Sequence, residues 1–448
     1  MSDESLEVKH SRNFERSTKL IVGFLRVYGC LPDYRRTASR LQKVIVVYSC
    51  LWLLGNVYTF YTYFGSEPIQ DYYTQLNETG FRMERHEETL MSATCVINFL
   101  FGLVIHVLYF LYSKRILNHL GKWVELEKFY FEKVKKDLVD PVSSSTLRWL
   151  LLLTAYNCVL FYIQFTPRFN FQIRPELSFA FFCILRYTDV LFLTIMQAAS
   201  SAAKTISHRY LDNLEKGEHG DLLWLEAVWL KLAELIRDSG TAMAPILFLH
   251  MMRYAVLGLF FSYMICVRFM VLLDKTDFLI LVAWTAEFAT IYFFIWKITT
   301  CAYDAQYKVS QLAETLRHFL NEKECNLNQE ITEQVISFQD TIVALPAKIE
   351  LLDYMVVDKK LFVSINKLYL TYLIILVQFK IAEYNIKERL INQRQPTSAV
   401  QPPTMDNNYV QSPDNNYQPE LVTMTPFLTT LTSALNFTPP ALKEVTQP

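Results

Sequence analysis

Seven segments of this chain are long and apolar enough to cross a lipid bilayer, and lipid allows few ways of folding them. A helix needs about 20 mostly apolar residues to cross the hydrocarbon, and its backbone must satisfy its own hydrogen bonds there. Only 19% of the residues are charged, whereas a soluble protein has about 25%. We therefore expect an all-α membrane protein with seven transmembrane helices, at residues 44–64, 90–112, 147–165, 177–199, 244–270, 278–299 and 361–380.

The lysines and arginines between these segments predict how the chain crosses the membrane. Connections that face the cytoplasm carry an excess of both residue types. Here lysine and arginine are frequent before the first segment and in the connections between segments two and three, four and five, and six and seven. They are rare in the other three connections. The N-terminus is therefore expected in the cytoplasm and the C-terminus outside the cell, which is opposite to the orientation of G-protein-coupled receptors. Asn77 begins an Asn-Glu-Thr sequon on an extracellular connection and is a candidate glycosylation site.

Four stretches outside the apolar segments are amphipathic. Residues 15–34 are too short to span and are expected to lie at the cytoplasmic membrane interface. The other three repeat apolar residues at three-to-four spacing, which predicts helices with one apolar face. These faces need partners, within one subunit or between several, and the pattern predicts a cytoplasmic helical bundle from residues 221–243, 303–320 and 328–345.

These features divide the chain into five parts. The last part is rich in Asn, Gln, Pro and Thr, a composition typical of disorder. The expected parts are a cytoplasmic N-terminal region with an interfacial helix (1–43), six transmembrane helices with the ligand-binding region (44–299), cytoplasmic anchor helices (300–357), a seventh membrane helix (358–380) and a disordered extracellular tail (381–448).

The sequence contains no pattern of catalytic or metal-binding residues. The eight histidines are scattered, no glycine-rich phosphate loop is present, and the eight cysteines lack CxxC spacing. The net charge of −1 shows no excess of basic residues of the kind that binds the phosphates of nucleic acid. We expect no enzymatic activity, no cofactor or metal, and no nucleic-acid partner. Membrane lipid is the partner that the composition implies.

Charged and aromatic side chains inside the spans are candidates for a ligand site, because charges are costly in lipid and apolar walls with a few polar groups suit a small molecule. Arg186 and Asp189 are three residues apart and are expected to pair on one helical face. Glu287 could contact a ligand, or it could pair with Arg253 or Arg268. The ligand-binding candidates are Asn98, Tyr156, Gln164, Phe182, Arg186, Tyr263, Trp284 and Glu287.

The last span carries polar residues at the two ends of an apolar run. Thr371 and Gln378 are seven residues apart and share one helical face, which Ile374 and Ile375 straddle. Such a face could line a path through the membrane, or it could hydrogen-bond to a neighbouring helix.

This run, Thr-Tyr, five apolar residues and Gln-Phe, resembles a motif of the insect gustatory receptor family, a relative of the insect odorant receptors. The resemblance covers roughly residues 20–380. It implies a tastant-gated, non-selective cation channel in the plasma membrane of chemosensory neurons, built as a homotetramer or as a heterotetramer with other gustatory receptor subunits. It also implies a shared cytoplasmic anchor and a ligand pocket in the outer half of each subunit.

The family pattern assigns roles to the last span. Ile375 would form a hydrophobic gate, Gln378 would ring the pore, and Phe379 would lie near its outer mouth. Thr371 and Ile374 would complete the pore and gate residues.

The residue after Thr-Tyr bears on the ligand. The sugar-receptor branch has Glu at this position, whereas this chain has Leu373. A bitter or other non-volatile small molecule is therefore the expected tastant. A fructose-type sugar receptor and an auxiliary subunit that needs a partner remain as alternatives.

Overall fold

Most helices of the structure are longer than a bilayer is thick. A computed structural model describes residues 13–32, 40–65, 85–140, 175–270, 277–323 and 328–394, with a few isolated residues between 148 and 156. Residues up to Lys387 form one compact unit. The elements are α2 (Asn13–Val27), α3 (Arg40–Gly65), α5 (Arg85–Val134), α7 (Pro175–Lys216), η2 (His219–Asp221), α8 (Leu222–Met270), α9 (Asp277–Lys323), α10 (Gln329–Ala344), β1 (Glu350–Leu351), β2 (Met355–Val356) and α11 (Lys359–Arg394).

Six of the seven predicted spans lie on these helices, and the expected all-α membrane fold is confirmed. The third span, 147–165, falls almost entirely outside the described residues. Among the described helices, four are long and apolar enough to cross a membrane. These are the segments Ile97–Val134, Leu222–Val267, Leu281–Glu322 and Lys359–Glu383.

Helix α8 joins the predicted amphipathic stretch and the fifth span into a single helix of 49 residues. At 1.5 Å per residue it is about 74 Å long, whereas the hydrocarbon core is about 30 Å thick. Much of α8 must therefore project from the membrane. Pro245 lies inside the helix without ending it. Because Ile246 and Leu247 beside it are fully buried, tertiary packing outweighs the missing hydrogen bond.

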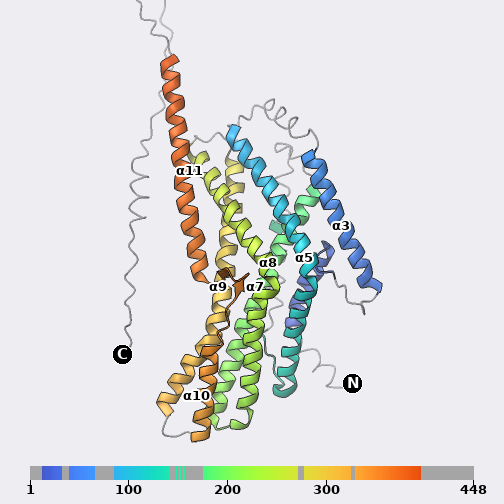
Figure 1. Cartoon of the computed structure of the whole chain (residues 1–448), viewed down its shortest axis with the longest axis vertical. Coiled ribbons are helices and arrows are strands. Elements are labelled where there is room, and N and C mark those ends of the chain that lie inside the picture. The colour runs from blue at the N-terminus through green and yellow to red at the C-terminus, as the bar shows by residue number, and fades with distance from the viewer. Residues whose placement is uncertain are drawn as a thin grey trace, which may run out of the picture. The chain divides into compact units, whose positions relative to one another are not determined.

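The amphipathic ends of the helices bury their apolar faces against one another. Figure 1 shows α10 beside the lower ends of α7, α8 and α9, and we call this assembly the basal bundle. Phe338 of α10 packs between Tyr210 of α7, a tilted ring at a centroid distance of 5.2 Å, and Trp229 of α8, an edge-to-face ring at 5.5 Å. These contacts join the apolar faces of α7, α8 and α10 within the single chain.

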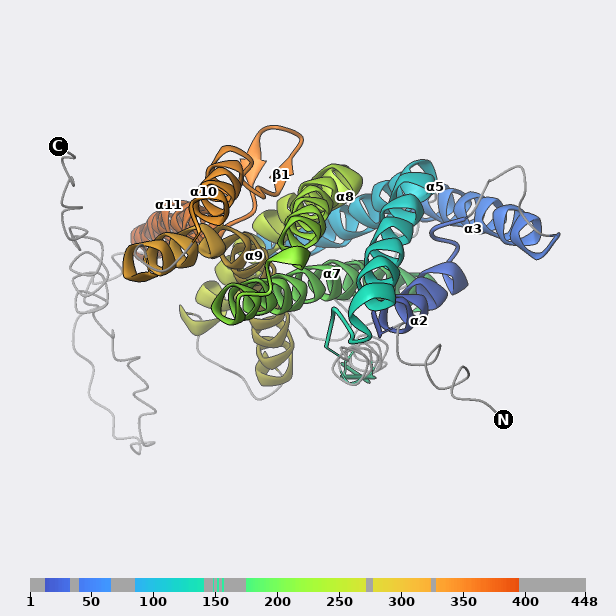
Figure 2. The ribbon, with the colours of Figure 1, turned by 90° about the horizontal axis from the view of Figure 1, so that it is seen from below.

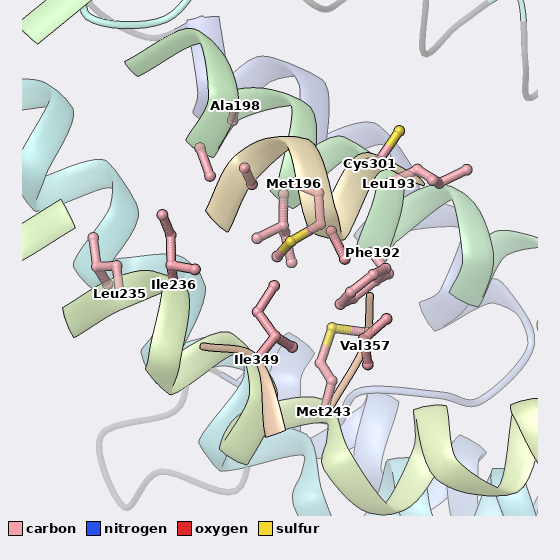
Figure 3. Packing of buried hydrophobic residues seen from close by; sticks show 14 of the residues in the cluster. Phe192, Leu193, Met196, Ala198, Leu235, Ile236, Met243, Cys301, Ile349 and Val357 are labelled. Atoms are coloured by element: carbon pink, nitrogen blue, oxygen red, sulfur yellow. The ribbon is translucent and has the colours of Figure 1, made fainter. Parts of the chain in front are cut away.

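A two-stranded hairpin, which periodicity did not predict, connects the basal bundle to α11. Strand β1 pairs with β2 in antiparallel fashion, and Leu352 and Asp353 turn the chain with positive φ angles of 54° and 60°. Ile349 and Val357, which flank the hairpin, point into the core beside Met243 (Figure 3). Strands of two residues are too short to produce an alternating sequence pattern.

Two contacts hold this hairpin in place. The Gln306 side chain of α9 donates to the carbonyl of Val357 at 2.8 Å and accepts from the amide of Ile349 at 3.3 Å. On α8, a Cβ added to Gly240 would lie 2.9 Å from the carbonyl oxygen of Glu350. Glycine is therefore required for the close approach of α8 to β1.

Helix α2 packs against α5 and α7 (Figure 2). Ile21 and Leu25 on its inner face are fully buried, and the ring of Phe14 stacks on Trp123 at 5.2 Å. Glu127 of α5 accepts a hydrogen bond of 3.2 Å from the amide of Phe14, so it caps the free N–H groups at the start of α2. The apolar face of the predicted interfacial helix is thus largely covered by protein.

Helix α11 is the least enclosed of the four apolar helices. Only 17% of the most apolar 18-residue stretch of α11 is buried, compared with 50% of the corresponding stretch of α8 and 39% of that of α9. The helix also runs to Arg394, past the predicted end of the span at Lys380. Residues 381–394 contain no Gly or Pro, and half of them are strong helix formers (Ala, Glu, Lys, Arg or Leu), so the helix can continue.

Candidate functional site

A network of buried polar side chains joins α7, α8 and α9. Arg186 of α7 is 1% exposed. Its Nη2 lies 3.3 Å from Oε2 of Glu287 on α9, and its Nη1 donates to the hydroxyl of Tyr254 on α8 at 3.1 Å. That hydroxyl in turn donates to the carboxylate of Asp189 on α7. Four side chains from three helices therefore share one chain of charge-assisted hydrogen bonds.

Two further contacts lie beside this network, one of them with α5. Oδ1 of Asn98 on α5 accepts hydrogen bonds from Nε and Nη2 of Arg253, at 3.0 and 2.8 Å. Nδ1 of His250 lies 3.2 Å from Oδ1 of Asp189, and both side chains are fully buried. Within the described structure, several buried atoms of this region have no hydrogen-bond partner: Nη1 of Arg253, Oε1 of Glu287, Oδ1 of Asp189 and both ring nitrogens of His250. The region thus keeps unpaired donors and acceptors in the interior.

The structure places the charges differently from the simple pairing expected along α7. Arg186 is paired with Glu287, and within the described residues it meets Asp189 only through the hydroxyl of Tyr254. The reason is that facing helices supply partners to both residues: α9 gives Arg186 a carboxylate, while α8 gives Asp189 a phenol. Glu287 is accordingly not paired with Arg253, which is held by Asn98.

The remaining described ligand-binding candidates form two groups. Tyr156 accepts a hydrogen bond of 3.0 Å from Thr290, which follows Glu287 by one turn of α9, and it lies close to the Glu287 side chain beside the network. Tyr263 and Trp284 form a separate small cluster with Met264 and Val267. Arg268 and three of the sequence candidates lie outside the described side chains: Asn77, Gln164 and Phe182.

Three residues of this region were not predicted from the sequence. His250 and Tyr254 on α8 belong to the network, and Tyr369 on α11 donates to the carbonyl oxygen of Tyr254 at 2.7 Å. A signal was present, because His250 and Arg253 place two ionisable groups on one predicted span, where each is a functional hypothesis by default. Tyr254 follows directly, but a tyrosine in an aromatic-rich membrane helix carries little information by itself.

One face of α11 packs onto the rest of the unit. Ile365 and Tyr369 are buried in the main core, and Leu373 and Leu376 pack against the cluster of Tyr263 and Trp284. These four α11 positions fall within about 80° of one another around the helix. Through Tyr369, this face also joins α11 to the buried polar network.

The opposite face of α11 is exposed, and it carries the motif residues. We call it the α11 stripe and define it by six exposed positions within about 80° of one another. Ile375 is 40% exposed and Phe379, beside the stripe, is 71% exposed. Ile374 is half-buried at its other edge. The stripe consists of Lys360, Ser364, Lys367, Thr371, Ile375 and Gln378.

Gly258 sets how closely α8 and α11 approach. A Cβ added at Gly258 would lie 2.3 Å from the hydroxyl oxygen of Tyr369. We expect Gly258→Ala to break the hydrogen bond from Tyr369 to Tyr254 and to cost about 1–3 kcal/mol through overpacking. Thermal unfolding of the detergent-solubilised protein measures this. Gly121→Ala is the matched control, because a Cβ there meets nothing within 4 Å. Equal melting temperatures for the two variants would contradict the close contact.

Within the described ranges, no group of three or more His, Cys, Asp or Glu side chains is arranged to hold a metal ion. The site consists instead of a charge-balanced network inside the helices and an exposed polar and apolar stripe on α11. The first can hold helices in register or contact a polar ligand, and the second is a surface that the described part of the chain leaves uncovered.

The comparisons with known proteins agree with this architecture. No protein of curated function matches the chain in sequence. The insect olfactory receptor OR5 from Machilis hrabei in complex with eugenol is similar in structure, with a TM-score of 0.60 and 15% identity over 82% of this chain and 99% of that chain. A second structure of that receptor has a TM-score of 0.56 and 14% identity, and the match covers 81% of this chain and 97% of that chain. At this identity the likeness shows a shared fold. The sequence model of the 7tm chemosensory receptor family, however, matches residues 18–383, and the chain therefore belongs to this family.

Proposed function

We propose that this chain is a gustatory receptor subunit that forms a ligand-gated, non-selective cation channel in the plasma membrane of chemosensory neurons. Four copies of α11 line the pore, and the buried region between α5, α7, α8 and α9 receives the ligand. The N-terminus and the basal bundle lie in the cytoplasm. The family membership supports a chemosensory role, and the motif on α11 supports the gustatory branch.

The observation that carries this proposal is the two-faced burial of α11. Its inner face is held by the core and by Tyr369, whereas every residue of the α11 stripe is exposed in the single chain. A membrane helix that faced only lipid would not need Gln378 on its outer side, because a polar group without a partner is costly in hydrocarbon. The hydroxyl of Thr371 is satisfied within α11, where it donates to the carbonyl of Lys367 at 2.9 Å. Copies of α11 around a water-filled axis satisfy Gln378. A ring of Ile375 side chains at the same place closes the path by dewetting.

The polar network supports a ligand site in the same subunit. Arg253 Nη1 and Glu287 Oε1 offer one donor and one acceptor to a polar group of a small molecule. Tyr254 lies at the centre of the network and accepts, through its backbone oxygen, the hydrogen bond from Tyr369 of α11. A ligand that displaces the side chains of the network would alter the hydrogen bond between Tyr254 and Tyr369, which holds α11. Such a ligand would bind the closed and open states with different affinities, as gating requires.

We propose a bitter or other non-volatile small molecule as the ligand. Leu373 occupies the position at which the sugar-receptor branch has Glu, and here it packs against the cluster of Tyr263, Met264 and Trp284. A carboxylate in this apolar contact would lose its hydration without a partner. The eugenol bound to the olfactory receptor of similar fold is likewise a small molecule.

Expression of the chain alone in cells without other chemoreceptors tests the proposal. We expect a panel of non-volatile small molecules to include at least one that evokes a cation current, and we expect this current to persist when G-protein signalling is blocked. Calcium imaging finds the active compound, and whole-cell recording measures the current. A response that vanishes with G-protein signalling would exclude a channel, and a response that requires a second receptor chain would identify an auxiliary subunit.

A further inference from the structure

Three aromatic side chains of α9 share one face beside the start of α11. Trp296, Tyr303 and Tyr307 follow one another at spacings of seven and four residues, so they lie on one side of the helix. The rings of Tyr303 and Tyr307 stack at 5.8 Å, and Trp296 and Tyr307 are 44% and 43% exposed. We call these three residues the α9 aromatic face.

Two lysines from different helices bring ammonium groups to this face. Lys359, the first residue of α11, is exposed, and its Nζ lies 4.1 Å from the centre of the Tyr303 ring. Lys297 of α9 places its Nζ 5.8 Å from the centre of the Trp296 ring. Neither lysine forms an ion pair within the described residues. A ring face takes up only part of an ammonium group, which has three N–H donors, so donors remain for an anion.

The α9 aromatic face and the two lysines lie at the boundary of the expected membrane spans. The sixth span ends near residue 299 and the seventh begins near residue 361. Figure 1 shows the lower end of α11 beside α9, so these two span ends face the same side of the membrane. In the proposed function this side is the cytoplasm, whose leaflet carries the anionic phospholipids. Tryptophan and tyrosine are also typical of membrane helices at the level of the lipid headgroups.

Two carboxylates are close in the sequence, but their positions leave the lysines available. Oδ1 of Asp358 accepts a hydrogen bond of 3.0 Å from the amide of Leu361 and so caps the start of α11. Asp304 directly follows Tyr303, so it lies about 100° around α9 from that ring. It is half-buried. Within the described residues, neither carboxylate forms an ion pair with Lys297 or Lys359.

We propose that Lys297, Lys359 and the α9 aromatic face bind an anionic phospholipid of the cytoplasmic leaflet. The two ammonium groups donate charge-assisted hydrogen bonds to the headgroup phosphate. The exposed rings pack against the glycerol and the first carbons of the acyl chains. A lipid held in this way contacts α9 and α11 at once. The assignment of the leaflet rests on the proposed function, which places the basal bundle in the cytoplasm.

Lys231 provides a matched control. It is exposed on α8, and its Nζ lies 4.1 Å from the centre of the Phe129 ring, the same distance as that between Lys359 and Tyr303. It precedes the expected start of the fifth span, residue 244, by 13 residues or about 20 Å. The charge of a membrane surface is screened within about 8 Å in physiological salt. Lys231→Gln therefore removes an equivalent cation that has no lipid to bind.

Native mass spectrometry of the full chain, purified in detergent, tests lipid binding. Titration with phosphatidylserine or phosphatidylcholine gives a dissociation constant for each lipid. We expect the wild type to prefer phosphatidylserine about 25-fold, and Lys297→Gln or Lys359→Gln to lose about fivefold each, the factor for one lysine near an anionic membrane surface. The double variant should bind both lipids equally, and Lys231→Gln should match the wild type. An excess of inorganic phosphate should not displace the lipid, because the rings hold its acyl chains.

Four results would overturn this assignment. Equal affinities of the wild type for the two lipids would exclude a site for anionic lipid. Unchanged phosphatidylserine binding in both single variants would exclude the two lysines, and an equal loss with Lys231→Gln would show an effect of net charge. Displacement of the lipid by inorganic phosphate would identify a site for soluble phosphate. Because these measurements need no conducting channel, a failure of lipid binding is distinct from a failure of the ligand-evoked current.

Discussion

Cells that express Ile375→Ala are expected to pass sodium current in the absence of any ligand. Ile375 is an apolar side chain, 40% exposed, on the same face as Gln378. Alanine removes three carbons from each copy, so that a ring of four becomes wider and less apolar and water can enter. A loss of about 1.4 kcal/mol of preference for the closed state raises the open fraction about tenfold while most channels are closed. We expect at least this increase in basal current.

Leu370→Ala is the matched control for this experiment. Leu370 lies on the same helix and is 46% exposed, but it points away from the α11 stripe. Its truncation removes a similar apolar area and should leave the basal current unchanged. Whole-cell current is normalised to surface-labelled protein in both cases. If Ile375→Ala reaches the surface at the wild-type level with the wild-type basal conductance, Ile375 is not the gate.

Much of the helical architecture could be predicted because lipid-sized apolar runs and three-to-four periodicity are local properties of the sequence. The helix that contains 361–380 and the helical stretch now seen as α10 both follow from such patterns. The continuity of α8 through Pro245 could not be predicted from such patterns, because it depends on the neighbouring elements that bury Ile246 and Leu247. The hairpin at 350–356 was not predicted either, because strands of two residues are too short to show an alternating pattern.

The contacts of the candidate site also depend on residues that are far apart in the sequence. The sequence identified Asn98, Arg186 and Glu287 as polar residues inside spans. The structure pairs Arg186 with Glu287 in one network, and it pairs Asn98 with Arg253 beside that network. Their partners could not be predicted, because Arg186 and Glu287 are 101 residues apart and meet only when α7 packs on α9. Local spacing favoured the nearer carboxylate of Asp189, whereas the side chains of facing helices decided the pairing.

Loss of Arg186 is expected to reduce the amount of folded receptor severely. The Arg186→Met variant leaves Glu287, which is 7% exposed, without its guanidinium partner, and it removes a donor to Tyr254. Breaking a buried ion pair by removing one partner costs about 3–5 kcal/mol, because the other charge stays buried and unpaired. That is a large share of a typical stability of about 5–15 kcal/mol. We expect surface-labelled protein to fall at least about tenfold.

The exposed pair of Lys122 with Asp238 supplies the control. Its side chains are 51% and 34% exposed, so Lys122→Met removes an ion pair that is largely in water. Exposed pairs contribute about 0–1 kcal/mol, and this variant should reach the surface at nearly the wild-type level. If both variants lose the same amount of surface protein, burial of the Arg186–Glu287 pair is not what makes it important.

The double variant Arg186→Met with Glu287→Gln separates structure from ligand binding. It removes both charges at once, so no unpaired carboxylate remains opposite position 186, and surface protein should recover most of the loss seen with Arg186→Met alone. A ligand-evoked current that recovers in proportion assigns the pair to helix packing. Surface protein that recovers while the current stays absent assigns Glu287 or Arg186 to ligand contact. Failure of the double variant to regain surface protein contradicts the pairing itself, because two independent losses would then simply add.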